Sequence, residues 1–108
     1  MLVLFDQSTP APLRPYLKAH TVTEARERGW DRLANGDLLN AAEAAGFQVF
    51  VTADKNLRYQ QNLAGRKIAI VAIGNAQWRV LENYTDLVVS AVDAAAPGSY
   101  VEVAIPRK

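Results

Sequence analysis

Short apolar runs rich in β-forming residues alternate along the chain with segments whose apolar residues have helical spacing. The runs at residues 2–5, 47–52 and 67–73 are nearly continuous in apolar side chains, which is typical of strands buried on both faces. Residues 20–23 form a candidate short strand, and residues 100–105 alternate as an edge strand does. Strands that alternate with helices predict an α/β fold with a mostly parallel sheet.

Helices are predicted between these strands. The clearest is DLLNAAEAAG, which opens at Asp37, carries one apolar stripe and ends near Gly46, a residue that suits a helix C-terminus. Asp37 is the candidate N-cap of this helix. Ser8 or Thr9 is a candidate cap for an irregular helix that runs to Lys18. The other predicted helices cover residues 23–28, 56–63, 77–82 and 85–95.

The composition is that of an ordinary globular domain. The 108 residues are 50% hydrophobic and 21% charged, which is enough for one real core, and we expect a single domain over residues 1–108. The expected architecture is a three-layer sandwich with a mostly parallel central sheet. There is no cysteine, so disulfides and thiolate metal sites are excluded. The formal net charge of +1 is too small to indicate a nucleic-acid partner, so any polyanion site must be a local patch.

Targeting signals are not apparent in the sequence. The stretch MLVLFDQSTP lacks the basic segment of a signal peptide, and its apolar run breaks at Asp6. No window approaches the roughly 18 apolar residues that a membrane span needs. We therefore expect a cytoplasmic protein that does not contact a membrane.

Acids stand at the ends of two predicted strands. Asp6 follows the first strand, and Asp54 follows the strand at 47–52. In open parallel sheets, ligands bind beyond the carboxyl ends of the strands. We expect the first turn of the helix at Asp37 to lie at the opposite edge, so that Asp37 joins the other two acids only if that helix is tilted. Either the three carboxylates share a hard divalent cation, which relieves their repulsion, or each acid merely caps a turn or helix.

The same residues resemble a known family. The stretch DLLNAAEAAGFQVFVTADKNL resembles the C-terminal half of a PIN-domain nuclease, in which an aspartate opens an alanine-rich helix and a strand leads to a Thr-x-Asp turn. The stretch LVLFDQSTP resembles the first strand, with its terminal aspartate, of short bacterial PIN-like proteins. The resemblance covers most of residues 1–75 and implies a PIN-like α/β sandwich.

The resemblance also implies a function. Asp6, Asp37 and Asp54 match its catalytic aspartates, which would ligate Mg²⁺ or Mn²⁺. The activity implied is endoribonucleolytic: a water activated by the metal hydrolyses an RNA phosphodiester bond. Some relatives are toxins of toxin–antitoxin pairs, so RNA and an antitoxin protein are the implied partners.

The sequence departs from the family pattern at several positions. Asn56 stands where relatives often have an acid, and Gln7 stands where short relatives often have glutamate. A glutamate expected between the first two aspartates has only Glu24 and Glu27 as candidates, and neither lies in a matching motif. The alternative is therefore a catalytically degenerate PIN-like module that binds nucleic acid or protein. A receiver-like phosphoacceptor domain is a third reading, but Asp6 lacks the adjacent second acid that such a domain needs.

Further residues are candidates for binding and positioning. Four residues around the third acid are candidates for substrate binding: Lys55, Asn56, Arg58 and Tyr59. Their basic side chains could hold phosphates and the tyrosine could stack on a base, although a solvated helix surface is the simpler explanation. Side chains that could orient the acids are Gln7, Asn40, Thr52 and Asn75, with Thr52 predicted to hydrogen-bond Asp54 or Asp6. Trp78 and Tyr84 are predicted to cover the sheet, and the edge strand at 100–105 offers a route to a homodimer.

Overall fold

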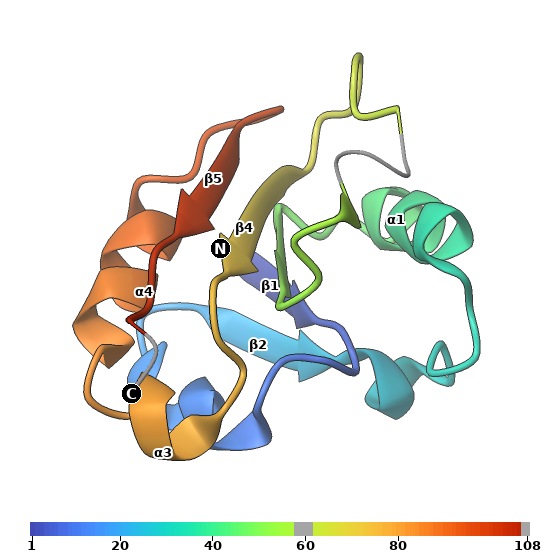
Figure 1. Ribbon diagram of the computed structural model, residues 1–108. Coiled ribbons are helices and arrows are strands. Elements are labelled where there is room, and N and C mark those ends of the chain that lie inside the picture. Colours follow the sequence, from blue (N-terminus) through green and yellow to red (C-terminus); the bar gives the residue numbers. More distant parts are fainter. Residues whose placement is uncertain (58–61, 107–108) are drawn as a thin grey trace.

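The computed structural model describes residues 1–57 and 62–106. At its centre is a five-stranded sheet with the strand order β2-β1-β3-β4-β5, and every neighbouring pair is parallel (Figure 1). The strands are β1 (Leu2–Phe5), β2 (Thr21–Glu24), β3 (Val49–Thr52), β4 (Ala69–Ile73) and β5 (Tyr100–Val103). The predicted parallel sheet is confirmed, and the alternating C-terminal strand joins it at the edge.

Helices connect the strands and cover both faces of the sheet. The short 3-10 helices are η1 (Ala11–Tyr16) and η2 (Ala25–Arg28). The α-helices are α1 (Asn35–Ala44), α3 (Trp78–Leu81) and α4 (Thr85–Asp93). The helix predicted at residues 56–63 falls largely on residues 58–61, which lie outside the described part of the chain. None of the helices in the described ranges is long and apolar enough to cross a membrane.

The core has two halves, one on each face of the sheet. Successive side chains of a strand point to opposite faces, so Val3 and Phe5 enter one half while Leu4 enters the other. The first half packs the sheet against η1, α3 and α4, and the second packs it against η2 and α1. Figure 1 shows α3 and α4 on one side of the strands and α1 on the other. This is the three-layer arrangement that the alternation of strands and helices predicts.

The start of α1 differs from the prediction. Helix α1 begins at Asn35 rather than Asp37, and its N-cap is Ala34, whose carbonyl accepts the first helical hydrogen bond from the backbone N–H of Leu38. Asp37 is the third residue of the helix, so the prediction that it is the N-cap was wrong. The predicted end of this helix near Gly46 is confirmed, since Gly46 has φ +87, a conformation that glycine adopts at little cost.

The helix after β1 also differs. Pro10 occupies its N-cap position, and neither Ser8 nor Thr9 caps it. Its form is 3-10 rather than α, and Pro15 lacks the N–H that an α-helix would bond to the carbonyl of Ala11. The hydroxyls of Ser8 and Thr9 are used instead at the end of β1, as described below.

A carboxylate of α1 fixes the segment that enters β4. Glu43 accepts hydrogen bonds from the Arg66 guanidinium at 2.5 Å, the Lys67 backbone N–H at 2.9 Å and the Ile68 backbone N–H at 3.3 Å. Burial, the largest single effect, raises the pKa of Glu43, but the two backbone N–H groups and Arg66 together bring it below the ordinary value of 4.5. The ionised carboxylate therefore joins α1 to the amino end of β4.

We expect Glu43→Gln to lower the free energy of unfolding at neutral pH by about 1–3 kcal/mol, because hydrogen bonds to a charged acceptor are lost. A pKa that is lowered by folding gives stability that is present above the unfolded pKa and is lost as the pH falls through the folded value. The difference between wild type and variant should therefore shrink as the pH falls below about 4.3. Urea unfolding across this pH range measures it. The exposed Glu82→Gln is the matched control, and a difference that stays constant with pH would contradict the assignment.

Candidate functional site

Asp6 lies where β1 ends and is held by its own loop. Its backbone N–H donates to the carbonyl of Val51 at 3.2 Å, which continues the pairing of β1 with β3. Its Oδ1 accepts hydrogen bonds from the backbone N–H and hydroxyl of Ser8, at 3.1 and 2.7 Å. It also lies 2.9 Å from the hydroxyl of Thr9, whose one proton is shared with the Val51 carbonyl at 2.8 Å. The carboxylate is half-buried, so these donors fix one of its oxygens against the protein.

Thr52, the last residue of β3, links Asp6 to Asp54. Its hydroxyl is buried, donates to Oδ2 of Asp6 at 2.5 Å and accepts the backbone N–H of Asp54 at 3.0 Å. The Ser8 hydroxyl accepts the backbone N–H of Ala53 at 2.9 Å, which ties the two strand ends together a second time. A single hydroxyl therefore separates the Asp6 carboxylate from the backbone of Asp54. The predicted hydrogen bonding of Thr52 is confirmed with both acids.

Asp54 is oriented from two directions. Its Oδ1 accepts the backbone N–H of Asn56 at 2.9 Å, in the local pattern by which aspartate shapes a turn. Its Oδ2 accepts the side-chain amide of Asn35 at 3.2 Å. Asn35 is the first residue of α1, so the beginning of this helix lies at the carboxyl end of β3.

The contact between Asn35 and Asp54 corrects an expectation. The first turn of α1 was expected at the opposite edge of the sheet, and it is found beside the end of β3. The reason is that the helix of a β-α-β unit runs antiparallel to its strands: α1 starts from the carboxyl side, where β2 ends, and returns to the amino side, where Glu43 meets the start of β4. No unusual tilt is needed to bring the helix start to this edge.

Asp37 shares that first turn but is not joined to the other acids. Its side chain is exposed and makes no hydrogen bond or ion pair with the residues at 1–57 and 62–106. Within those ranges, no three His, Cys, Asp or Glu side chains are gathered closely enough to hold one metal ion. The structure thus brings together Asp6 and Asp54, while the role of Asp37 in a shared metal site stays a prediction.

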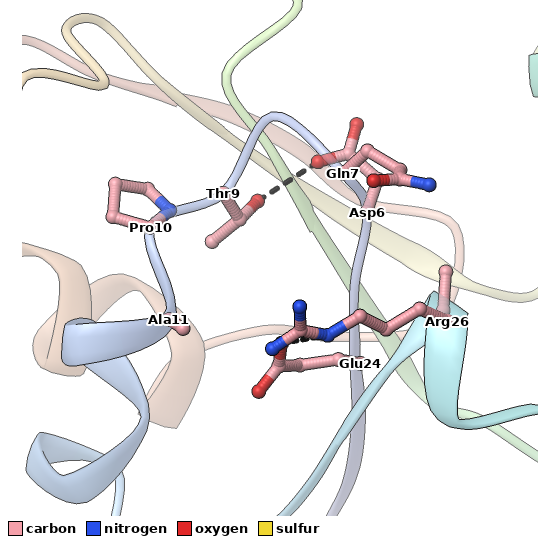
Figure 2. Close-up of a pocket in the computed structure, with 8 residues that line it drawn as sticks. Asp6, Gln7, Thr9, Pro10, Ala11, Glu24 and Arg26 are labelled. Atoms are coloured by element: carbon pink, nitrogen blue, oxygen red, sulfur yellow. Dashed lines mark hydrogen bonds and ion pairs between the residues drawn. The ribbon is translucent and has the colours of Figure 1, made fainter. Parts of the chain in front are cut away.

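A pocket lies between Asp6 and the end of β2. It has a volume of about 280 Å³ and is lined by Asp6, Gln7, Thr9, Pro10, Ala11, Glu24, Ala25 and Arg26. Figure 2 shows Asp6 and Thr9, joined by their hydrogen bond, across the pocket from Glu24 and Arg26. Glu24 ends β2 and is the register partner of Phe5, the residue before Asp6, so it lies at the same carboxyl edge of the sheet. Its place directly after the predicted strand at 20–23 is the sequence signal that could have identified it.

The negative charge of Glu24, which lines the pocket, is largely neutralised by two arginines. Arg14 lies 3.3 Å from Glu24 and 2.7 Å from Glu27, and Arg26 lies 3.3 Å from Glu24. The hydrogen bond from the Glu24 backbone N–H is the largest cause of a lowered pKa at Glu27; desolvation opposes it and Arg14 reinforces it. Asp6, in contrast, has no ion pair with any described residue. The pocket therefore has one carboxylate without a cation partner.

The remaining predicted residues have varied roles. Gln7 lines the pocket and donates to the carbonyl of Asp31 at 2.9 Å, and Asn75 shapes the turn before α3 by accepting the backbone N–H of Gln77 at 2.8 Å. The exposed residues Asn40 and Lys55 point to no described partner. Arg58 and Tyr59 lie outside the described residues. Ser8 and Thr9, which hold Asp6, were predicted only as helix caps.

Comparisons with known proteins add no assignment: no family model matches the chain, and no curated protein or solved structure matches it significantly. The fold and the site define an all-parallel α/β domain with two aspartates, linked by a threonine hydroxyl, at adjacent strand ends.

We expect Thr52→Val to lower the free energy of unfolding by about 1–3 kcal/mol, because the substitution leaves Oδ2 of Asp6 and the Asp54 N–H without their partner. Thr52→Ser, which keeps the hydroxyl, should retain more stability. Thr21→Val is the matched control, since Thr21 is exposed on β2. Chemical denaturation measures all three, and equal losses for Thr52→Val and Thr21→Val would show that the hydroxyl does not hold this edge.

Proposed function

We propose that the chain is a PIN-like, metal-dependent ribonuclease that hydrolyses RNA phosphodiester bonds. Asp6 and Asp54 hold Mg²⁺ or Mn²⁺, and Asp37 either joins them or positions the attacking water. The supporting observation is the linked pair of aspartates at the carboxyl ends of β1 and β3. The strand order reverses between these two strands, and open α/β sheets bind their ligands at such a point.

The acceptor capacity of the two acids fits a hard divalent cation. An ionised carboxylate offers about four lone-pair sites, two on each oxygen. From residues 1–57 and 62–106, Oδ2 of Asp6 accepts only Thr52 and each oxygen of Asp54 accepts one hydrogen bond, so all three oxygens can accept further. Mg²⁺ keeps several waters and is usually bound through one or two carboxylates, so this pair is a sufficient protein contribution.

The surrounding residues have defined tasks in this proposal. The donors Ser8 and Thr9 hold Oδ1 of Asp6 and leave Oδ2 to face Thr52 and the site. The amide of Asn35 fixes Asp54 from α1, so the two carboxylates are oriented before any substrate arrives. A bound Mg²⁺ or Mn²⁺ would supply positive charge for the phosphodiester and lower the pKa of a water molecule.

A catalytically degenerate binding module is the second candidate. The observation that favours it is the set of donors around Asp6: a backbone N–H and the hydroxyls of Ser8 and Thr52 stabilise this carboxylate, and Thr9 shares its proton between Asp6 and Val51. Asn56 contributes only its backbone N–H to Asp54. On this reading the acids are structural supports for the strand ends, and the domain binds its partner through another surface.

Cleavage of single-stranded RNA in the presence of Mn²⁺ tests the leading proposal. Loss of a residue that merely supports a metal ligand lowers activity roughly 10- to 100-fold. Asp6→Asn and Asp54→Asn remove ligands themselves, so we expect each to lower the cleavage rate by more than this. Asp86→Asn is the matched control, because Asp86 is exposed in the first turn of α4. Equal rates in the wild type and both site variants would refute the assignment.

Binding of the metal separates the two candidates. Calorimetric titration of the wild type with Mn²⁺ should give heat that Asp6→Asn abolishes and Asp86→Asn retains. Asp6→Asn keeps the size of the side chain and one acceptor oxygen, so its fold is checked by its unfolding transition. No heat from the wild type at millimolar Mn²⁺ would favour the binding module.

A further inference from the structure

An aromatic groove lies between η1 and α3. It has a volume of about 700 Å³ and is lined by Pro12, Pro15, Tyr16, Lys18 and Trp78. The ring centroids of Tyr16 and Trp78 lie 5.9 Å apart, and the ring planes are tilted by 52°. Tyr16 is 48% exposed, which is unusual for a large ring that has a neighbouring hydrophobic core available.

The local sequence explains why these rings face outward. Leu13 and Leu17 are fully buried and anchor the segment to the core, which leaves the prolines and Tyr16 on the outer side of η1. Trp78 begins α3 and packs against the core while also lining the groove. In Figure 1 the blue turn of η1 lies beside the orange helix α3, near the edge where β1 and β4 end. The prediction that Trp78 covers the sheet therefore describes only one of its two faces.

The groove adjoins the pocket at Asp6. Pro10 and Ala11 line that pocket, and the next residue, Pro12, lines the groove. Consecutive Cα atoms are about 3.8 Å apart, so an extended ligand lying across the start of η1 reaches both. The linings of the two hollows therefore meet at consecutive residues of η1, Ala11 and Pro12.

The charge beside the groove is positive. Lys18 is the charged residue among those that line it, and Arg79 follows Trp78 on α3. Both side chains are exposed, and neither forms an ion pair with a residue in the described ranges. Flat rings that stack on bases, combined with cations that contact phosphates, are the features by which proteins bind single-stranded nucleic acids. Aromatic grooves also bind proline-rich peptides, but such peptides have no need of Lys18 and Arg79.

We infer that this groove binds single-stranded RNA, with bases stacked on Tyr16 and Trp78 and a phosphate held by Lys18. The choice of RNA rests on the proposed nuclease function, in which the same strand continues into the site at Asp6. The binding itself needs no metal and no cleavage, so it can be measured separately from the reaction.

Tryptophan fluorescence can show where the oligonucleotide binds. The chain has only Trp30 and Trp78, so Trp30→Phe leaves Trp78 as the sole tryptophan, and Trp78→Phe leaves Trp30. Addition of a short oligoadenylate, with EDTA present, should quench the tryptophan fluorescence of Trp30→Phe and leave that of Trp78→Phe unchanged. Trp30 packs against Phe47 and Arg28 away from the groove, so it serves as the internal control.

The affinity of the same oligonucleotide tests the individual contacts. Tyr16→Ala should weaken binding by about 5- to 100-fold, the range that loss of one stacking ring gives. Lys18→Gln should reduce the slope of log affinity against log salt by about 0.7, the value for one phosphate contact on a single strand. Lys67→Gln is the matched control, because Lys67 is exposed and precedes β4 at the opposite edge of the sheet.

The outcomes separate the groove from the nuclease proposal. Quenching at Trp78 without RNA cleavage in Mn²⁺ would support the groove and count against the nuclease. If Tyr16→Ala and Lys18→Gln change neither the rate of RNA cleavage nor the affinity for the oligonucleotide, the groove proposal is refuted while the nuclease proposal stands. The groove proposal also fails if inorganic polyphosphate binds as tightly as oligoadenylate, or if a polyproline peptide quenches Trp78 and oligoadenylate does not.

Discussion

The carboxyl edge of the sheet depends on the hydroxyl of Thr52. A hydroxyl has one proton to donate, and an ionised carboxylate can only accept, so the proton of Thr52 points to Asp6 and its oxygen receives the N–H of Asp54. A hydrogen bond to a charged acceptor is stronger than a neutral one, and here it is buried. The Asp6 carboxylate, as the acceptor, thereby sets the direction of the hydrogen bonds that run from Asp54 through Thr52.

The parallel register places these groups next to each other. Phe5 of β1 lies beside Val51 of β3, so the residues that follow, Asp6 and Thr52, lie next to each other at the carboxyl edge. A shift of one residue would turn Thr52 to the opposite face and separate it from Asp6. The buried apolar side chains on both faces of β1 and β3 hold this register, so the packing of the core maintains the geometry of the polar edge.

The sequence predicts the elements better than it predicts their contacts. Continuous apolar runs identify the buried strands, and Asp6 and Asp54 stand out because an acid directly follows such a run. Strand order and register come from tertiary packing, so the pairing of Glu24 with Phe5 could not be predicted from local pattern. The expected edge for the start of α1 was wrong, because a helix between parallel strands runs antiparallel to them and so begins at their carboxyl edge. The aromatic groove escaped prediction because Tyr16 and Trp78 are distant in sequence and meet only in the fold.

One segment, from Asp6 to Leu17, serves both the acidic site and the aromatic groove. Its first residues hold the carboxylate, its middle lines the pocket, and its 3-10 helix presents the prolines and Tyr16. Proline has a fixed φ, and Leu13 and Leu17 are fully buried, so this segment has little conformational freedom to lose when a ligand binds. A base stacked on the groove would therefore meet a surface whose position relative to Asp6 is already fixed. In a chain whose net charge is only +1, the local positive charge of Lys18 would attract the polyanion, and this rigidity would fix the bound strand relative to Asp6.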